Sequence, residues 1–283
     1  MSIHHEARPG RVRLQVADLD RSLDYYRQVL GLDVLEDDGA RTLLGVTETA
    51  EPLVELHERP GAAAVPPRGR LGLFHFAILL PDRRELGAFL RHLSDAGVAI
   101  GASDHRVSEA LYLRDPDGLG IEVYADRPRQ EWRYRGEELV MTTEPLDRQG
   151  LLDAAADREW AGVPAETTMG HVHLHVGDLD EADAFYHGAV GLEPTVWSYP
   201  GALFLSAGGY HHHLGLNTWA AGAPPARQDE ARLLDWTLVL PSPEAVERTR
   251  ERAEAAGRGV SGDAETAILE DPWGTRLRVT VEP

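Results

Sequence analysis

One stretch of the sequence occurs twice, at an offset of 160 residues. The two copies are RVRLQVADLDRSLDYYRQVLGL, starting at residue 11, and HVHLHVGDLDEADAFYHGAVGL, starting at residue 171. Each begins with alternating apolar and polar residues, the pattern of a half-buried β-strand. Apolar residues at helical spacing follow, between a capping Asp18 or Asp178 and a terminating Gly31 or Gly191. Each copy therefore predicts a strand followed by a helix.

A second pair of segments repeats at the same offset. FHFAILLP from residue 74 matches LDWTLVLP from residue 234. The helix that follows ends near Gly97 in one case, and runs from Ser242-Pro243 to about Gly257 in the other. Strands then lead into YLRDPDGLGIEVY and ILEDPWGTRLRVT, where Asp-Pro and Gly predict a hairpin turn. The chain is therefore predicted to contain four βαβββ units, which we number modules one to four.

The modules suggest a division of the 283 residues into two domains, which is a usual number for this length. Modules one and two fill a first predicted domain over residues 1–126. Modules three and four fill a second over residues 169–283. Residues 127–168 form a link between them, in which LDRQGLLDAAAD predicts a short helix. The predicted fold class is α+β.

The composition favours a small-molecule ligand. A formal net charge of -19 would repel nucleic acid and anionic membranes, so neither is expected as a partner. The absence of cysteine excludes disulfides and thiolate ligands, which leaves carboxylates and the 13 histidines to bind a metal. The sequence shows no signal-peptide pattern, and no apolar run approaches the roughly 18 residues of a membrane span. We expect a cytoplasmic protein.

The order of the modules resembles that of the vicinal oxygen chelate superfamily, which includes glyoxalases, bleomycin resistance proteins and extradiol dioxygenases. Pairs of βαβββ modules in this superfamily curl into a half-open barrel around a metal ion. The resemblance covers nearly the whole chain outside the link and the first ten residues, and implies two domains of this kind. Together with open sheet edges, it also implies a homo-oligomer. Because the fold hosts several activities, function must come from the site.

The resemblance points to particular metal-ligand positions on the first and last strands of the modules. These are Arg11, His75, Glu122, His171, Asp235 and Arg278. If the modules pair in chain order, both candidate sites contain an arginine. If module two pairs with module three, one site becomes His75, Glu122 and His171, the facial triad that suits Fe(II). The other becomes Arg11, Asp235 and Arg278, which can form an ion-pair cluster without metal. We adopt this second pairing, within one chain or between two chains of a dimer.

Residues 105–122, HRVSEALYLRDPDGLGIE, resemble the signature segment of extradiol ring-cleaving dioxygenases. The matching positions are His105, Leu111, Tyr112, Asp115, Pro116, Gly118 and Glu122. Ser103 departs from the pattern, which usually has Gly, Asn, Thr or an aliphatic residue there. Tyr112 and Glu122 can face one cavity if their strands pair across the turn. The resemblance implies that His105 and Tyr112 donate hydrogen bonds to substrate oxygens.

Three consecutive histidines, His211, His212 and His213, precede an apolar-small-apolar triplet at residues 214–216. The same dioxygenases have an acid–base histidine that is separated from such a triplet by one residue, which implies that His212 has this role. His211 and His213 would then point to the opposite strand face, unless a bulge intervenes. A competing alignment makes His213 a fourth metal ligand, as in glyoxalase-like members. Further candidates for the pocket wall are His173, Asn217, Trp197, Tyr199 and Trp219.

The resemblance thus implies Fe(II)-dependent extradiol cleavage of a catechol by dioxygen, of the catechol 2,3-dioxygenase type. Two alternatives remain open. A glyoxalase-type isomerase or lyase would require a fourth protein ligand, which His213 could supply, and a redox-inert metal. A metal-free small-molecule binding protein of the same fold would leave the triad histidines without a metal.

Overall fold

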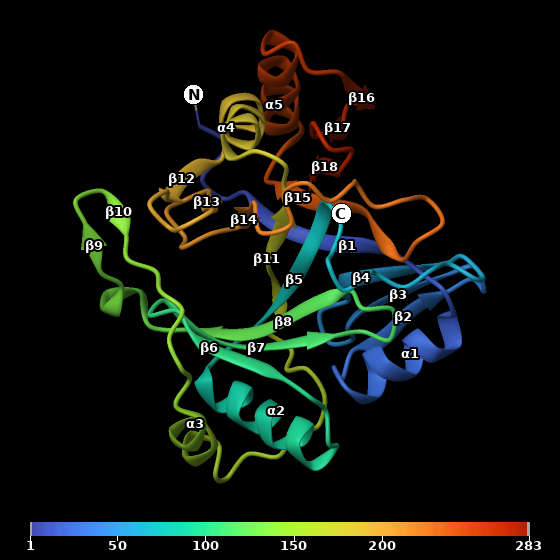
Figure 1. The fold of residues 1–283 in the computed structure, drawn as a ribbon, viewed down its shortest axis with the longest axis vertical. Helices are drawn as coiled ribbons and strands as arrows, with labels where there is room; N and C mark the ends of the chain where they lie inside the picture. Colours follow the sequence, from blue (N-terminus) through green and yellow to red (C-terminus); the bar gives the residue numbers. More distant parts are fainter. Residues whose placement is uncertain (1, 282–283) are drawn as a thin grey trace.

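The computed structural model describes residues 2–281, and their core consists of two eight-stranded sheets (Figure 1). Each predicted module forms a strand, a helix and three further strands, which confirms the α+β fold class. Module one contains β1 (Arg8–Val16), α1 (Leu19–Gln28), β2 (Asp33–Asp37), β3 (Arg41–Val46) and β4 (Glu51–Glu58). Module two contains β5 (Gly72–Leu80), α2 (Arg83–Asp95), β6 (Gly101–Asp104), β7 (Ser108–Arg114) and β8 (Gly120–Asp126). Module three contains β11 (Thr168–His175), α4 (Leu179–Asp183), η2 (Ala184–Val190), β12 (Glu193–Val196), β13 (Ala202–Ser206) and β14 (Leu214–Asn217). Module four contains β15 (Arg232–Leu240), α5 (Pro243–Ala255), β16 (Val260–Gly262), β17 (Thr266–Glu270) and β18 (Arg276–Val281).

The sheets combine the modules in the exchanged order. One has the strand order β12-β13-β14-β11-β5-β8-β7-β6, and the other β16-β17-β18-β15-β1-β4-β3-β2. Strand β5 therefore pairs antiparallel with β11, and β1 pairs antiparallel with β15. The predicted pairing of module two with module three, and of one with four, is confirmed within a single chain (Figure 1).

The helix ends follow the predicted capping residues. The side chains of Asp18 and Asp178 each accept a backbone N–H from the first helical turn. Ser242 caps α5 in the same way. Gly31 and Gly191 follow their helices with φ of 76° and 97°, a conformation that favours glycine. The helix of module three departs from the prediction, because its second half, η2, is a π-helix.

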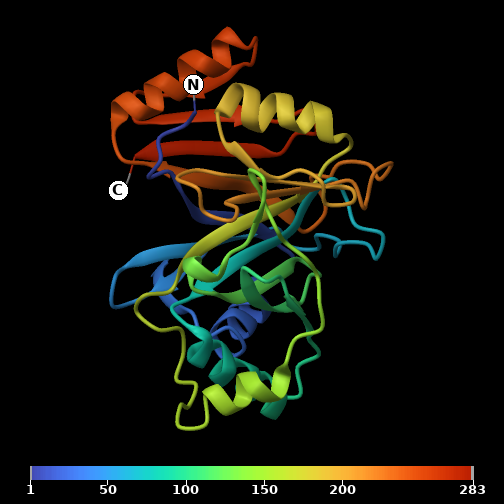
Figure 2. The same cartoon turned by 90° about the vertical axis from the view of Figure 1, so that its left-hand side faces the viewer.

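The link between modules two and three contains more structure than the predicted short helix. Its elements are η1 (Arg129–Glu131), β9 (Tyr134–Arg135), β10 (Glu138–Leu139) and α3 (Arg148–Ala154). Helix α3 lies on α2, where Arg83 and Arg91 donate hydrogen bonds to the carbonyl groups of Gly150 and Leu152. Figure 2 shows α2 and α3 together at one end of the molecule and α4 and α5 together at the other.

Several sequence-based expectations stay predictions. Each sheet contains strands from both halves of the chain, so the proposed division at residues 126 and 168 describes the sequence and not the sheets. Homo-oligomerisation and a cytoplasmic location also stay predictions. Within residues 2–281, the helices are too short and too polar for any of them to cross a membrane.

The sheet of modules one and four contains the predicted ion-pair cluster, but its membership differs. Arg13 binds Asp235 at 2.6 Å, whereas Arg11 binds Glu55 of β4 at 2.9 Å. The reason is strand register, because Arg13 lies directly opposite both Asp235 on β15 and Glu55 on β4. Arg278 is 3.8 Å from Asp235, as the prediction implied. The cluster is therefore held by a buried glutamate that was not among the predicted members.

The cluster predicts a large stability effect at Glu55. Because Glu55 is buried and neutralises Arg11 and Arg13, Glu55→Ala should leave unpaired charge inside the sheet. We expect the free energy of unfolding to fall by about 3 kcal/mol, as for other buried ion pairs that lose one partner. The matched control is Glu36→Ala, which removes an exposed partner of Arg41 and should cost less than about 1 kcal/mol. Urea unfolding measures both, and equal effects would contradict the structural role of the cluster.

Candidate metal centre and cavity

Three buried side chains converge where modules two and three meet. His75 lies on β5, Glu122 on β8 and His171 on β11. The Nε2 atoms of His75 and His171 are 3.0 Å and 3.3 Å from the same Oε2 of Glu122. One ligand atom from each residue lies within 4.8 Å of the others. The three residues predicted as a metal-ligand set are therefore adjacent.

The protonation states of this cluster suit a divalent cation. Burial lowers the pKa of His171 to about 4, so its imidazole is neutral at neutral pH. Burial alone would raise the pKa of Glu122, but His171 and His75 beside it hold that pKa well below its usual range. The buried Nε2 of His75 faces Glu122 at 3.0 Å but is not aligned for a hydrogen bond with it, although buried polar atoms normally make one. Two imidazoles and an ionised carboxylate form the donor set that non-haem Fe(II) prefers.

The signature segment positions Glu122 through a hairpin. Tyr112 on β7 pairs directly with Glu122 on β8. In the turn between these strands, the side chain of Asp115 accepts the N–H groups of Asp117 and Leu119 at 2.9 Å and 2.8 Å. Gly118 has a φ of 84°, which favours glycine in this turn. The Asp-Pro and Gly positions of the signature thus fix the register that brings Tyr112 beside the metal-ligand cluster.

His105 and Tyr112 form a hydrogen-bonded pair on the cavity wall. The Nδ1 of His105 lies 2.6 Å from the carbonyl oxygen of Thr142, and its Nε2 lies 2.6 Å from the hydroxyl of Tyr112. A carbonyl only accepts, so Nδ1 carries a proton, and in neutral His105 the Nε2 accepts from Tyr112. Burial, together with Glu122, raises the pKa of Tyr112 well above its usual range. Tyr112 therefore keeps its hydroxyl proton at neutral pH.

The three consecutive histidines, residues 211–213, do not form part of a strand. Residues 211–213 precede β14 in a bend, so alternation of strand faces does not apply to them. His212 lines the cavity, and its ring centroid is 4.1 Å from that of His171. His211 does not point away as predicted, because its Nδ1 lies 2.7 Å from the Nδ1 of His212. The other nitrogen of His211 lies 2.9 Å from a carboxylate oxygen of Asp126.

These contacts select a tautomer of His212. If His211 carries its one proton at Nε2, where it donates to Asp126, its Nδ1 accepts from Nδ1–H of His212. The Nε2 of His212 is then the nitrogen without a proton. Burial lowers the pKa of His212 well below its usual range, which keeps this imidazole neutral at neutral pH. His212 can therefore accept a proton at Nε2.

Of the remaining candidates for the pocket wall or a fourth metal ligand, only some line the cavity. His173 lines the cavity and lies directly opposite His75. Asn217 is buried behind it, and its side-chain amide lies 2.9 Å from Nε2 of His173. His213 lies outside both the cavity lining and the group of adjacent ligand atoms, with its Nδ1 accepting the N–H of Ala207 at 3.1 Å. Within the described part of the chain, the ligand cluster thus has three members, and neither Asn217 nor His213 lines the cavity.

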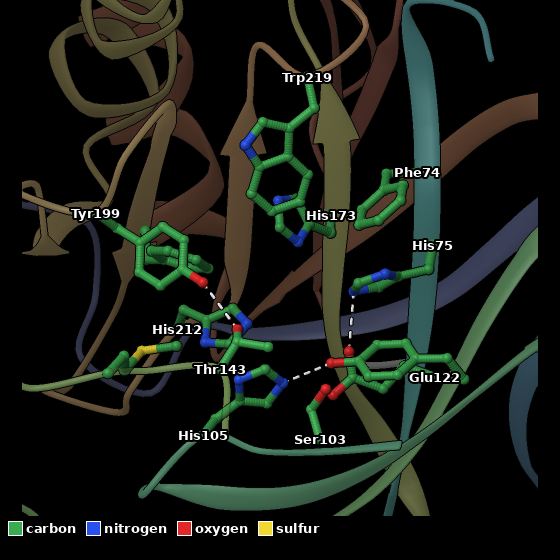
Figure 3. A pocket seen from close by; sticks show the side chains of 13 residues that line it. Phe74, His75, Ser103, His105, Glu122, Thr143, His173, Tyr199, His212 and Trp219 are labelled. Atoms are coloured by element: carbon green, nitrogen blue, oxygen red, sulfur yellow. Dashed lines mark hydrogen bonds and ion pairs between the residues drawn. The ribbon is translucent and has the colours of Figure 1, made fainter. Parts of the chain in front are cut away.

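A cavity of about 230 Å³ lies beside the cluster, and two of its members, His75 and Glu122, line it (Figure 3). Its lining includes Tyr199 and Trp219, which the sequence suggested, whereas Trp197 is not part of it. The link contributes Met141 and Thr143, and the hydroxyl of Thr143 lies 2.8 Å from that of Tyr199. Sequence reasoning missed both link residues because neither belongs to a repeat or a motif. It also missed Phe74 and Phe204, which look like ordinary core residues of strands. Ser103, where the sequence departs from the signature pattern, is another lining residue.

The cluster predicts a specific loss of metal at Glu122. Glu122→Ala removes the one carboxylate that both imidazoles face, so Fe(II) affinity should fall by more than about a hundredfold. The matched control is Glu193→Ala, which changes an exposed glutamate of β12. Metal content after anaerobic loading and desalting measures the difference. Equal iron content in the two variants would exclude Glu122 as a ligand.

Comparisons with known proteins match this architecture. A family model, the Glyoxalase/Bleomycin resistance protein/Dioxygenase superfamily, matches residues 8–123 and 168–279. The catechol-2,3-dioxygenase of Bacillus subtilis (strain 168) is 46% identical over 275 residues, covering 96% of each chain. Biphenyl-2,3-diol 1,2-dioxygenase 3 of Rhodococcus globerulus is 32% identical over 158 residues, which cover 53% of this chain and 81% of that protein. The structure of glyoxalase I from Zea mays has a TM-score of 0.58 and 19% identity, and the match covers 98% of this chain and 92% of that one.

The matched ranges include the four modules and leave out most of the link. The maize enzyme shares the fold at low sequence identity, so it supports the architecture alone. The family-model match and the relative at 46% identity confirm the resemblance seen in the sequence. The chain belongs to the Glyoxalase/Bleomycin resistance protein/Dioxygenase superfamily, the vicinal oxygen chelate proteins.

Proposed function

We propose that this protein is an Fe(II)-dependent extradiol dioxygenase that opens a catechol ring beside its two hydroxyl groups. The observation that carries the proposal is the convergence of His75, Glu122 and His171 beside a cavity with His212 on its wall. The similarity to the catechol-2,3-dioxygenase of Bacillus subtilis over 96% of the chain supports an extradiol-type reaction. The substrates would be a catechol and dioxygen.

The triad residues fit the metal that this reaction requires. Fe(II) held by His75, Glu122 and His171 would keep open positions for the two catechol oxygens and would supply electron exchange with dioxygen. The ligands come from three different strands of one sheet, and all three are buried. Their protein surroundings therefore exclude water from the ligand side of the site.

His212 is placed to move a substrate proton. In our proposal, its unprotonated Nε2 accepts a proton from a catechol hydroxyl and later returns it to the product. His211 and Asp126 keep the other nitrogen protonated, so that His212 presents a lone pair at Nε2.

Tyr112 is placed to donate a hydrogen bond to a substrate oxygen. Its hydroxyl lies 2.6 Å from Nε2 of His105, and it can turn its proton towards an oxygen on which charge develops. His105, held by the carbonyl of Thr142, orients the hydroxyl of Tyr112. These roles agree with the signature segment but give the two residues different tasks.

A glyoxalase-type reaction receives no support from the ligand cluster. Gly215 pairs with His173 just as Glu55 pairs with Arg13 in the other sheet, so a glycine occupies the place where module one supplies a carboxylate. A Cβ at position 215 would lie 2.8 Å from the ring of His173. The position is therefore filled by the imidazole and has no room for a fourth ligand.

The proposed role of His212 predicts a separation between turnover and metal binding. His212→Ala should lower kcat by about 10² to 10⁴ fold, because the proton acceptor is lost while the triad is intact. The matched control is His187→Ala, which removes a half-exposed histidine that is paired with Asp183 and lies outside the cavity lining. Formation of coloured ring-opened product is measured alongside iron content. A His212→Ala variant with full iron and normal kcat would rule out the proton-transfer role.

A further inference from the structure

The cavity wall beyond the metal centre is aromatic and uncharged. Phe74, Met141, Tyr199, Phe204 and Trp219 form this part of the lining (Figure 3). The sequence contains no lysine, so arginine is the only side chain with a fixed positive charge. Among the described residues, no arginine lines the cavity. A ring substituent that extends away from the triad therefore meets aromatic faces, a thioether and hydroxyl groups.

The arginines near the lining residues in sequence are engaged elsewhere. Arg106, next to His105, binds Glu144 at 2.6 Å, and Arg127, which follows β8, binds Asp104 at 2.7 Å. Arg114, two residues after Tyr112, donates to the carbonyl group of Gly118 at 2.8 Å and lines a neighbouring hollow instead of this cavity. Turning any of these guanidinium groups into the cavity would break these contacts. A substrate carboxylate would consequently lose its hydration without gaining a cationic partner.

The aromatic side chains are arranged to hold an apolar group. The rings of Phe74 and Trp219 are nearly perpendicular, with centroids 5.5 Å apart. Those of Tyr199 and Phe204 are also nearly perpendicular, at 5.7 Å. Edge-to-face pairs of this kind leave ring faces free for a further apolar group. Trp219 is half-exposed, so the cavity mouth itself is aromatic.

From these observations we infer a substrate class: catechols whose ring substituents are apolar and uncharged, with exclusion of catechols that carry a carboxylate. The inference rests on the proposed extradiol function. The net charge of -19 acts in the same direction, because it repels anionic substrates at longer range. The protein should therefore distinguish catechols by the charge of their ring substituent and not by its size.

The test compares 3,4-dihydroxyphenylacetate with its methyl ester. The methylene group insulates the ring, so the two compounds differ mainly in the charge of the side chain. Calorimetric binding to the Zn(II)-loaded protein, which does not turn over, gives Kd for both, and kcat/KM with Fe(II) gives the second readout. We expect the ester to bind at least about a hundredfold more tightly, with a similar preference in kcat/KM. Equal affinity, or tighter binding of the acid, would overturn the inference.

A charge introduced into the wall provides the converse test. Met141→Arg places a cation in the cavity from the link, and it should shift the ratio of the two affinities towards the acid by at least about tenfold. Met141→Leu is the matched control, and it should keep the wild-type ratio. An unchanged ratio in Met141→Arg would count against the inference. If neither compound, nor 4-methylcatechol, is bound or cleaved by the wild type, the proposed function itself fails.

Discussion

The pairing of β5 with β11 is the constraint on which the site depends. These strands belong to different halves of the sequence, and their antiparallel contact puts His75 opposite His173 and brings His171 beside Glu122. A register shift in β11 between Met169 and His171 changes the direction in which the side chain of His171 leaves the strand. If the modules paired in chain order, the two imidazoles would lie in different sheets. The cavity wall, the hairpin of β7 and β8, and the histidine run are all positioned relative to this contact.

The two sheets share one strand order, but they carry different side chains at corresponding positions. Where one has His171, His75 and Glu122, the other has Arg11, Asp235 and Arg278, and Glu55 corresponds to Gly215. The arginines and carboxylates neutralise one another, so that sheet needs no metal. In the other sheet, the neutral imidazole of His171 and the ionised carboxylate of Glu122 lie beside His75 with no arginine among them, a set that a cation can balance. One sheet thus holds an ion-pair cluster at these positions, and the other holds the candidate metal centre.

The features that depend on repeats and fixed motifs could be predicted from the sequence. The offset of 160 residues revealed four modules, and charge sorting selected their pairing. Strand register was harder to predict from the sequence. A register shift in β1 places Arg13, and not Arg11, opposite Asp235. The bend at residues 211–213 brings Nδ1 of His211 within 2.7 Å of Nδ1 of His212. Link residues such as Met141 and Thr143 had no repeat partner that could indicate their place. Such details depend on long-range packing, which local patterns do not encode.

In our proposal, modules two and three of one chain close around a single iron ion. The decisive experiment is anomalous diffraction at the iron edge, from crystals grown anaerobically with Fe(II). We predict one peak per chain, bounded by the imidazoles of His75 and His171 and the carboxylate of Glu122. A peak at another position, or well-ordered triad side chains without any peak in iron-saturated crystals, would contradict the claim.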